Sequence, residues 1–300
     1  MKNGEWIARD GTRLAWQIAH GREDGPHMVL VNGLGGSAPA WKHLIASFET
    51  DYNITLWDYR GLFASRQPEG TKVSPSVVIH ANDLEDLLDF FHIQKAVFMG
   101  WSYGGQVLME LYRRRPKVFE AIVLLNPMVG PASNSLRLPQ LFTQLFSYLL
   151  AAWSPFWKFA GPFAERVIRS GHVLSVVKSM GLVGPDLDEE VFREIALEFV
   201  NLDHDVFRAT LESAEHYDGR DVLPEIGVPV LVVAGTRDFI VLPETVREIV
   251  RLIPGAQLIF INKTSHYTAV EKPLETANAV RLFLDTLKTN HAAKNDSYHE

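Results

Sequence analysis

The sequence predicts an α/β fold: a mostly parallel sheet of eight strands flanked by helices, with a helical cap inserted after the sixth strand. Short β-branched segments alternate with amphipathic helical patterns along most of the chain, which is typical of βα units. Near the amino end, an Asp10-Gly11 turn favours an antiparallel hairpin. Residues 128–223 break the alternation because they contain no convincing strand.

Each predicted strand is too short for a typical helix and is bounded by turn residues. The opening hairpin pairs residues 5–8 with residues 14–18. The buried strands that follow lie at residues 27–31, 54–57, 96–99, 121–125, 228–234 and 257–261. Parallel strands place their carboxyl ends at one edge of a sheet, so we expect the side chains that follow these strands to gather there.

The helices between the strands have recognisable ends. Ser74-Pro75 is a cap and first-turn pair at the start of one helix. Pro243 begins another, which Pro254-Gly255 ends. In the last helix, apolar residues recur at helical spacing from Leu274 to Leu287.

The domain organisation follows from these elements. Residues 1–127 and 224–287 are expected to form the core, and residues 128–223 the cap, because structureless loops of that length are uncommon. Aromatic and aliphatic residues crowd the segment from Leu141 to Phe163, either as the core of the cap or as pocket lining. Residues 288–300 are polar and are expected to form a frayed tail.

Composition excludes several classes of function. The formal net charge of −7 argues against nucleic acid or an anionic membrane as the main partner. The absence of cysteine excludes disulfides, thiolate metal ligands and cysteine nucleophiles. No transmembrane span is expected, since the uncharged stretch at residues 138–157 is interrupted by Pro139 and Pro155. The amino end has no apolar signal region, so we expect a cytoplasmic protein.

The most informative motif is Gly100-Trp101-Ser102-Tyr103-Gly104. A GxSxG pentapeptide is weak evidence alone, but this one directly follows a predicted strand and precedes a helical pattern. That context predicts a tight turn that presents the Ser102 hydroxyl at the sheet edge, at the positive end of a helix. An incidental serine in a glycine-rich turn is the alternative.

A serine hydroxyl needs a base and an orienting carboxylate to act as a nucleophile. Among the eleven histidines, His266 follows the last predicted strand at the expected edge, whereas His80 fits a core-facing helix position. Asp238 follows the strand at residues 228–234, and an ordinary surface-turn aspartate is its alternative reading. The order Ser102, Asp238, His266 is the one that a nucleophile-elbow hydrolase requires.

Negative charge that develops during acyl transfer needs backbone donors. The glycine-rich stretch 32–37 can turn its amides toward the site, and the amides of Leu34 and Tyr103 are predicted to form the oxyanion hole. This stretch lacks the lysine and Ser/Thr of a P-loop and the spacing of a dinucleotide site. Three side chains are predicted to contact the substrate: Trp101, Val241 and Tyr267.

With these residues in place, the chain resembles the α/β-hydrolase superfamily over nearly its whole length. The resemblance covers Asn32-Gly33, residues 58–61 (Asp-Tyr-Arg-Gly) with Ser65, the three catalytic residues, and Glu271 with Pro273. It implies a core sheet of eight strands, a cap after the sixth, a pocket between cap and sheet, and no cofactor. No metal site is predicted. The serine at the elbow disfavours the epoxide hydrolases and haloalkane dehalogenases, which use an aspartate.

Two positions depart from the family pattern. Asn32 stands where many members have histidine, which leaves the hydrogen bonding behind the oxyanion loop open. Leu62-Phe63 follows Arg60-Gly61 where many members have a second glycine, and would add a bulky group near the pocket entrance.

The predicted function is hydrolysis of a carboxylic ester of a small, mainly apolar molecule through an acyl-enzyme. The same triad could serve carbon–carbon bond hydrolysis, lactone or thioester hydrolysis, or perhydrolysis, because fold and triad do not determine substrate. A slow-turnover ligand receptor or an inactive scaffold that kept the fold is the alternative from another class.

Overall fold

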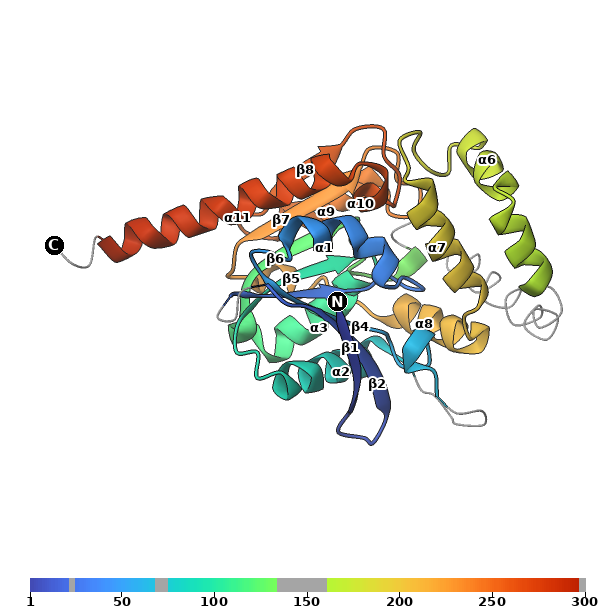
Figure 1. Cartoon of the computed structure of the whole chain (residues 1–300). Coiled ribbons are helices and arrows are strands. Elements are labelled where there is room, and N and C mark those ends of the chain that lie inside the picture. Colours follow the sequence, from blue (N-terminus) through green and yellow to red (C-terminus); the bar gives the residue numbers. More distant parts are fainter. Residues whose placement is uncertain (22–24, 68–74, 134–160, 297–300) are drawn as a thin grey trace.

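The computed structural model describes the chain except for residues 22–24, 68–74, 134–160 and 297–300 (Figure 1). An eight-stranded sheet runs through its centre in the order β1-β2-β4-β3-β5-β6-β7-β8. Strand β2 runs antiparallel to both neighbours, and the strands from β4 to β8 are parallel. The predicted mostly parallel sheet of eight strands is therefore confirmed.

The hairpin forms around Asp10-Gly11 as predicted, with Gly11 in the left-handed region at φ +85°. Predicted and observed strand ends differ by at most three residues. At most of the ends that differ, hydrogen-bonded pairing extends past the apolar run, whereas the strand predicted from residue 228 begins at Val230. The strands are β1 (Lys2–Ile7), β2 (Arg13–Ala19), β3 (His27–Val31), β4 (Asn53–Trp57), β5 (Ala96–Trp101), β6 (Phe119–Leu125), β7 (Val230–Gly235) and β8 (Gln257–Ile261).

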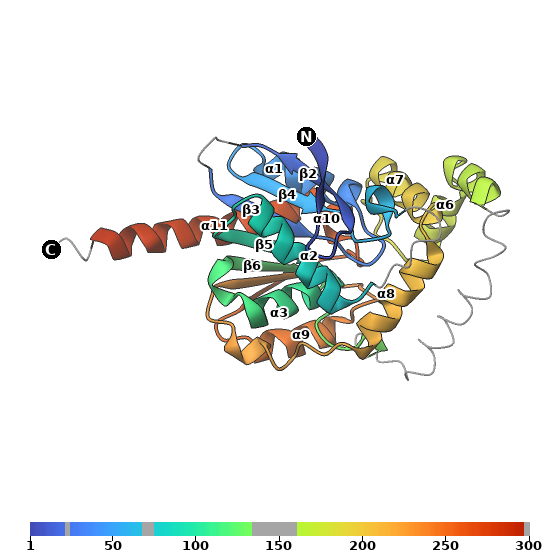
Figure 2. The ribbon, with the colours of Figure 1, turned by 90° about the horizontal axis from the view of Figure 1, so that it is seen from below.

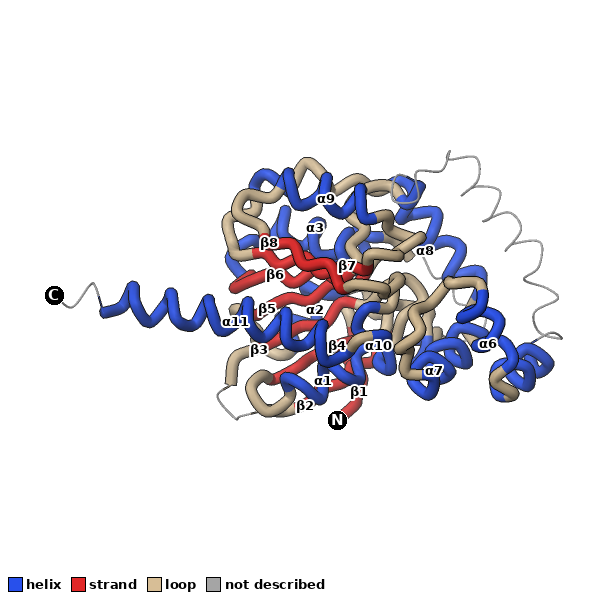
Figure 3. Tube along the Cα trace, turned by 90° about the horizontal axis from the view of Figure 1, so that it is seen from above, coloured by secondary structure: helices blue, strands red, loops and turns tan. Residues whose placement is uncertain are grey.

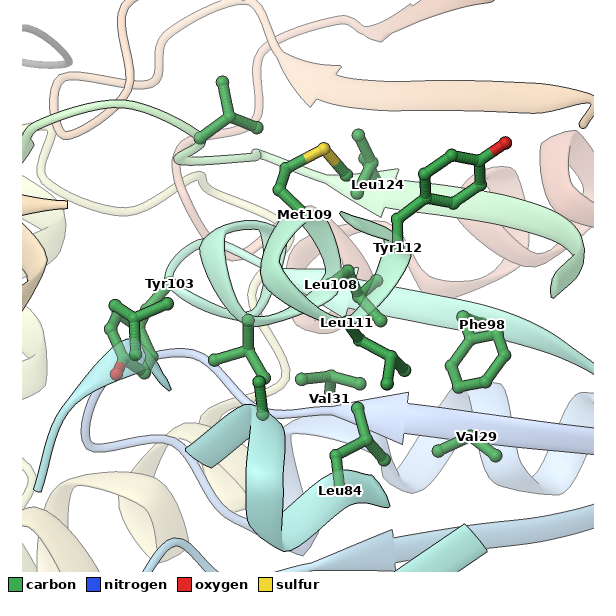
Figure 4. Close-up of a cluster of buried hydrophobic side chains, with 14 of the residues drawn as sticks. Val29, Val31, Leu84, Phe98, Tyr103, Leu108, Met109, Leu111, Tyr112 and Leu124 are labelled. Atoms are coloured by element: carbon green, nitrogen blue, oxygen red, sulfur yellow. The ribbon is translucent and has the colours of Figure 1, made fainter. Parts of the chain in front are cut away.

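Helices cover both faces of the sheet (Figures 2 and 3). On one side lie α2 (Val77–Phe90), α3 (Gly104–Arg114) and α9 (Pro243–Leu252), and on the other α1 (Lys42–Phe48), α10 (Thr268–Glu271) and α11 (Pro273–Asp296). Successive side chains of each strand serve opposite faces, because the period of a strand is two. In β3, for example, Val29 packs toward α2 and α3 (Figure 4), while Met28 packs toward α1.

Two helix boundaries correct the sequence analysis. Helix α2 is capped by Ser76, whose hydroxyl accepts a hydrogen bond from the amide of Ile79, and not by Ser74. Helix α11 continues to Asp296, so the expected frayed tail from Lys288 onward is wrong over most of its length. A polar composition predicts that a segment is exposed, but it does not predict that the segment is unstructured. Ala and Lys have a high helix propensity even in water, so an exposed helix can form.

Between β6 and β7 the described residues form helices and no strand, as predicted. Residues 161–169 are helical, followed by α6 (His172–Ser179), α7 (Glu189–Val200) and α8 (His204–His216). Most of the aromatic segment at residues 141–163 lies outside the described residues. None of the helices that the structure describes combines the length and apolar character needed to cross a bilayer.

Candidate active site

The carboxyl ends of three parallel strands bring the predicted catalytic residues to one edge of the sheet. Ser102 directly follows β5, Asp238 lies shortly after β7, and His266 lies shortly after β8. Helices α7 and α8 lie at the end of the sheet to which the parallel strands point, and the far end of α11 points the other way (Figure 1). This edge is where open α/β sheets bind their ligands.

Ser102 occupies a sharp turn between β5 and α3. Its φ of +52° lies in the left-handed region, which is uncommon for a residue with a side chain and marks a strained, over-determined site. A Cβ at Gly104 would lie 2.3 Å from the carbonyl oxygen of Val31, and one at Gly105 would lie 2.6 Å from that of Met128. Only glycine therefore allows α3 to start so close to its neighbours.

Asp238 and His266 are hydrogen-bonded. The distance from Nδ1 of His266 to Oδ2 of Asp238 is 2.8 Å, and both side chains are buried. The other carboxylate oxygen accepts hydrogen bonds from the amides of Ile240 and Val241 at 2.8 and 2.9 Å. Because Nδ1 is engaged by the carboxylate, Nε2 is the imidazole nitrogen that remains to act on a reacting group.

Asp238 is held in its ionised form. Burial alone would raise the pKa of its carboxyl group, but the charge and hydrogen bond of His266, with further bonds from Val241 and Asn126, lower this pKa below its usual range. An ionised carboxylate beside an imidazole stabilises the cation that forms when the imidazole accepts a proton.

Asn126 is a site residue that the sequence analysis missed. Its side-chain amide donates to Oδ2 of Asp238 at 2.7 Å, and its side-chain oxygen accepts from the Thr268 hydroxyl at 2.8 Å. It is fully buried and has a φ of +46°. The available signal was its position directly after β6, at the same sheet edge as Ser102.

The loop that carries His266 is anchored on two sides. Glu271 accepts hydrogen bonds from the amide and the hydroxyl of Ser265, the residue before the histidine. The indole nitrogen of Trp101 donates to the carbonyl oxygen of His266 at 3.1 Å, and the two rings lie 5.7 Å apart. Trp101 therefore links the nucleophile turn to the base.

Ser102 and His266 are not hydrogen-bonded to each other in this structure. Both side chains are almost buried, with 6% and 4% of their surface exposed. Catalytic hydrogen bonds are often long in a free enzyme and shorten when substrate binds. The Trp101 bridge keeps the serine turn and the imidazole in neighbouring positions.

The predicted oxyanion donors are available. Neither the amide of Leu34 nor that of Tyr103 donates a hydrogen bond to another residue in the described part of the chain. The indole of Trp101 packs on the loop that carries Leu34, since a Cβ at Gly33 or Gly36 would lie 2.9 or 2.5 Å from this ring. The two donors therefore belong to segments in close contact.

The three predicted substrate contacts have different surroundings. The rings of Trp101 and Tyr267 lie 5.5 Å apart at a tilt of 57°. Both help to line a small apolar cavity, together with Ala40, Trp41, Leu125, Thr268, Ala269 and Val270. Val241 is fully buried in the core, and its amide binds Asp238. Contact of these side chains with substrate stays a prediction.

Asn32, which stands where many family members have histidine, makes two side-chain hydrogen bonds. Its side chain donates to the carbonyl oxygen of Trp57 at 2.9 Å and accepts from the indole nitrogen of Trp41 at 2.7 Å. At the second departure, Leu62 is fully buried, whereas Phe63 is half-buried with a φ of +47°.

Among the described residues, no group of three or more His, Asp or Glu side chains could hold a metal ion.

Residues 26–273 match the profile of the alpha/beta hydrolase fold family. The chain belongs to this family. The match covers the predicted catalytic positions and the helices between β6 and β7, so the α/β-hydrolase resemblance seen in the sequence is confirmed.

Several similar proteins are named as hydrolases. RutD of Pseudomonas syringae pv. syringae, provisionally named a carbamate hydrolase, is 29% identical over 263 residues, which cover 88% of this chain and 95% of RutD. The pimeloyl-[acyl-carrier protein] methyl ester esterase of Vibrio atlanticus is 23% identical over 84% of this chain and 91% of its own. The structure of a thermophilic esterase from Thermogutta terrifontis superposes with a TM-score of 0.70 at 22% identity, over 96% of this chain and 99% of its own. The family and these names support a hydrolase.

Proposed function

We propose that this α/β hydrolase is a serine carboxylesterase that cleaves a small, mainly apolar ester through an acyl-enzyme. The observation that carries the proposal is the hydrogen-bonded Asp238–His266 pair at the sheet edge where Ser102 occupies a left-handed turn. An oriented imidazole beside a serine is the arrangement that nucleophilic acyl transfer requires.

In the proposed mechanism, Oγ of Ser102 attacks the ester carbonyl carbon while Nε2 of His266 accepts the hydroxyl proton. The oxyanion that forms is bound by the amides of Leu34 and Tyr103. Collapse of the tetrahedral intermediate breaks the bond to the alcohol, which takes the proton from His266. His266 then deprotonates a water molecule, which attacks the carbonyl carbon of the acyl-enzyme. Collapse of this second tetrahedral intermediate breaks the bond to Oγ of Ser102, which takes the proton from His266, and the acid is released.

We further propose that α6, α7 and α8 form a cap over this site. Helix α7 is joined to the core at both ends: Asp188 bonds His43 at 2.9 Å, and Glu198 accepts from the hydroxyl of Ser37 in the oxyanion loop. Aromatic side chains of α7 and α8 reach the same loop, since a Cβ at Gly35 would lie about 3 Å from the rings of Phe199 and Phe207. These rings favour an apolar substrate.

Carbamate hydrolysis is a second candidate, favoured by the likeness to RutD. A carbamate carbonyl passes through the same type of tetrahedral intermediate, so the triad and the oxyanion hole would serve both reactions. The leaving group and the chemistry of the cap face would decide between them.

The test combines covalent labelling with turnover. A fluorophosphonate should modify the protein at Ser102, located by mass spectrometry of the peptide, and p-nitrophenyl esters of increasing acyl length should be turned over alongside an aryl carbamate. Labelling without turnover of any substrate would favour the alternative that the protein is a slow-turnover ligand receptor. Labelling at another residue would exclude Ser102 as the nucleophile.

A further inference from the structure

Behind the proposed oxyanion hole lies a group of three buried aromatic side chains: Tyr59, His80 and Tyr103. All three are almost or completely inaccessible to solvent, and none belongs to the triad. Tyr103 follows the nucleophile, Tyr59 lies just beyond β4, and His80 lies on α2. Figure 4 shows Tyr103 in the buried cluster that also contains Val31 and Leu84.

Each arm of the oxyanion hole is joined to this group by a hydrogen bond. The hydroxyl of Tyr59 donates to the carbonyl oxygen of Asn32, two residues before Leu34, at 2.7 Å. The hydroxyl of Tyr103 and Nδ1 of His80 lie 2.9 Å apart. The two arms come from different loops, β3 to α1 and β5 to α3, and the structure joins them from behind.

The link between the arms is a ring stack. The Tyr59 and His80 rings are 4.3 Å apart and nearly parallel, at 19°, and the Tyr59 and Tyr103 rings meet edge to face at 5.5 Å. A displacement of one ring would therefore press on the other two, because packed interiors have little free volume.

His80 is neutral in this environment. Burial, with a smaller contribution from the positive charge of Arg60, lowers the pKa of His80 to about 3. A neutral imidazole has one donor and one acceptor nitrogen. Nε2 of His80 is buried and has no partner among the described residues.

This lack of a second partner decides the direction of the hydrogen bond. If Tyr103 donates to Nδ1, only the Nε2 proton is left unpaired. If Nδ1 donates instead, both the Tyr103 proton and the Nε2 lone pair are left unpaired. Since each buried polar group left unpaired destabilises the fold, the arrangement with one unpaired group is favoured, and Tyr103 is the donor and His80 the acceptor.

We propose that Tyr59 and His80 are positioning residues, which hold the amides of Leu34 and Tyr103 at the separation that a tetrahedral oxyanion needs. The inference rests on the proposed function, because it assigns a support to the oxyanion hole of that reaction. Oxyanion donors act only if they are preorganised, and their supporting side chains set that geometry.

Four variants of the whole protein test the proposal: Tyr103→Phe, His80→Phe, the double variant, and Tyr59→Phe. Each single change should lower kcat on the best p-nitrophenyl ester about tenfold with KM within about twofold, less than the loss of a direct oxyanion donor. The inhibition constant of phenylboronic acid, whose tetrahedral adduct places an oxygen in the hole, should rise in proportion.

The double variant separates positioning from simple packing. It leaves neither a buried hydroxyl nor a buried ring nitrogen without its partner, so its stability to urea should recover relative to the worse single variant. Its kcat should stay low because the ring at position 103 has no hydrogen bond that orients it. Recovery of kcat in step with stability, or wild-type kcat in folded single variants, would overturn the inference.

Tyr112→Phe is the matched control. Tyr112 is also a buried tyrosine, on α3, and its hydroxyl accepts a hydrogen bond from the amide of Gly227, away from the site. This variant should lose some stability and keep its kcat, and an equal loss of kcat would count against a specific role of the stack. Ser102→Ala in the same series distinguishes the two proposals: surviving turnover overturns both, whereas lost turnover with unaffected stack variants overturns only this inference.

Discussion

The two halves of the candidate site are held by different forces. Around Asp238 and His266, polar side chains supply the geometry: Asn126 and Glu271 bind the acid and the histidine loop through hydrogen bonds. Around Ser102, backbone shape supplies it, through a left-handed turn and glycines that approach backbone oxygens too closely for any side chain.

Because of this difference, we expect the two halves to tolerate substitutions unequally. A polar support can be removed one hydrogen bond at a time, each worth about 1 kcal/mol net when both partners adapt. A close backbone approach leaves no such margin, because a single added carbon must move whole segments. Three predictions probe this comparison, and a fourth concerns a buried carboxylate outside both halves.

The largest effect is expected at the centre of the backbone-held half. Ser102→Ala removes the nucleophile and should lower kcat about 10⁶-fold, the loss seen when a serine hydrolase loses this group. Ser47→Ala on α1 is the control and should keep wild-type activity, because this hydroxyl donates to the carbonyl oxygen of His43 in its own helix. Residual turnover of more than a few per cent in Ser102→Ala would show that Ser102 is not the nucleophile.

In the polar half, Asp238→Asn should lower kcat about 10⁴-fold. The amide keeps the size of the carboxylate but cannot stabilise an imidazolium and favours the wrong tautomer of His266. Asp221→Asn, which removes an exposed carboxylate paired with Arg113, serves as the control and should change kcat by less than about twofold. Similar kcat values for the two variants would show that Asp238 is not the acid of a triad.

Gly235→Ala tests whether close backbone approach also matters within the polar half. A Cβ there would lie 2.2 Å from the carbonyl oxygen of Ser265, so the loop before His266 must shift. Displacement of a catalytic group by about 1 Å can cost about 100-fold in rate, and we expect a loss of kcat of that order. At Gly227 the nearest atom would be 3.9 Å away, so Gly227→Ala should stay active. Equal kcat in both variants would show that the loop adapts freely.

The smallest effect concerns stability and pH. Burial and the negative charge of Glu198, against a hydrogen bond from the amide of Ala64, raise the pKa of Asp58 to about 6. The folded state therefore binds a proton that the unfolded state releases near pH 4, so stability falls as pH rises between about 4 and 6 and stays reduced above. The rise of this pKa to about 6 corresponds to about 2–3 kcal/mol in the free energy of unfolding.

Asp58→Asn keeps the shape of the side chain and cannot ionise. Urea unfolding should show the variant to be more stable than the wild type at about pH 7.5, with the difference much reduced near pH 4.5. A difference of the same size at both values would contradict ionisation of Asp58 as its cause.

Local patterns predicted the parts of this protein that depend on neighbours in the sequence. The strand periodicity, the Asp10-Gly11 hairpin and the strand–GxSxG–helix context predicted the sheet, which the structure confirms. The same patterns predicted Ser102, Asp238 and His266, which the structure brings to one edge. Helix α11 shows the limit of composition, since a polar exposed sequence can remain helical.

Only the tertiary structure decided which polar groups support the site. Asn126 looks like a turn residue until the fold brings it within 2.7 Å of Asp238, and His80 looks like an ordinary core residue until it meets Tyr103. Chain order and periodicity determine which face of an element is buried. They do not determine which distant side chain a buried polar atom will bind, because that depends on how whole elements pack.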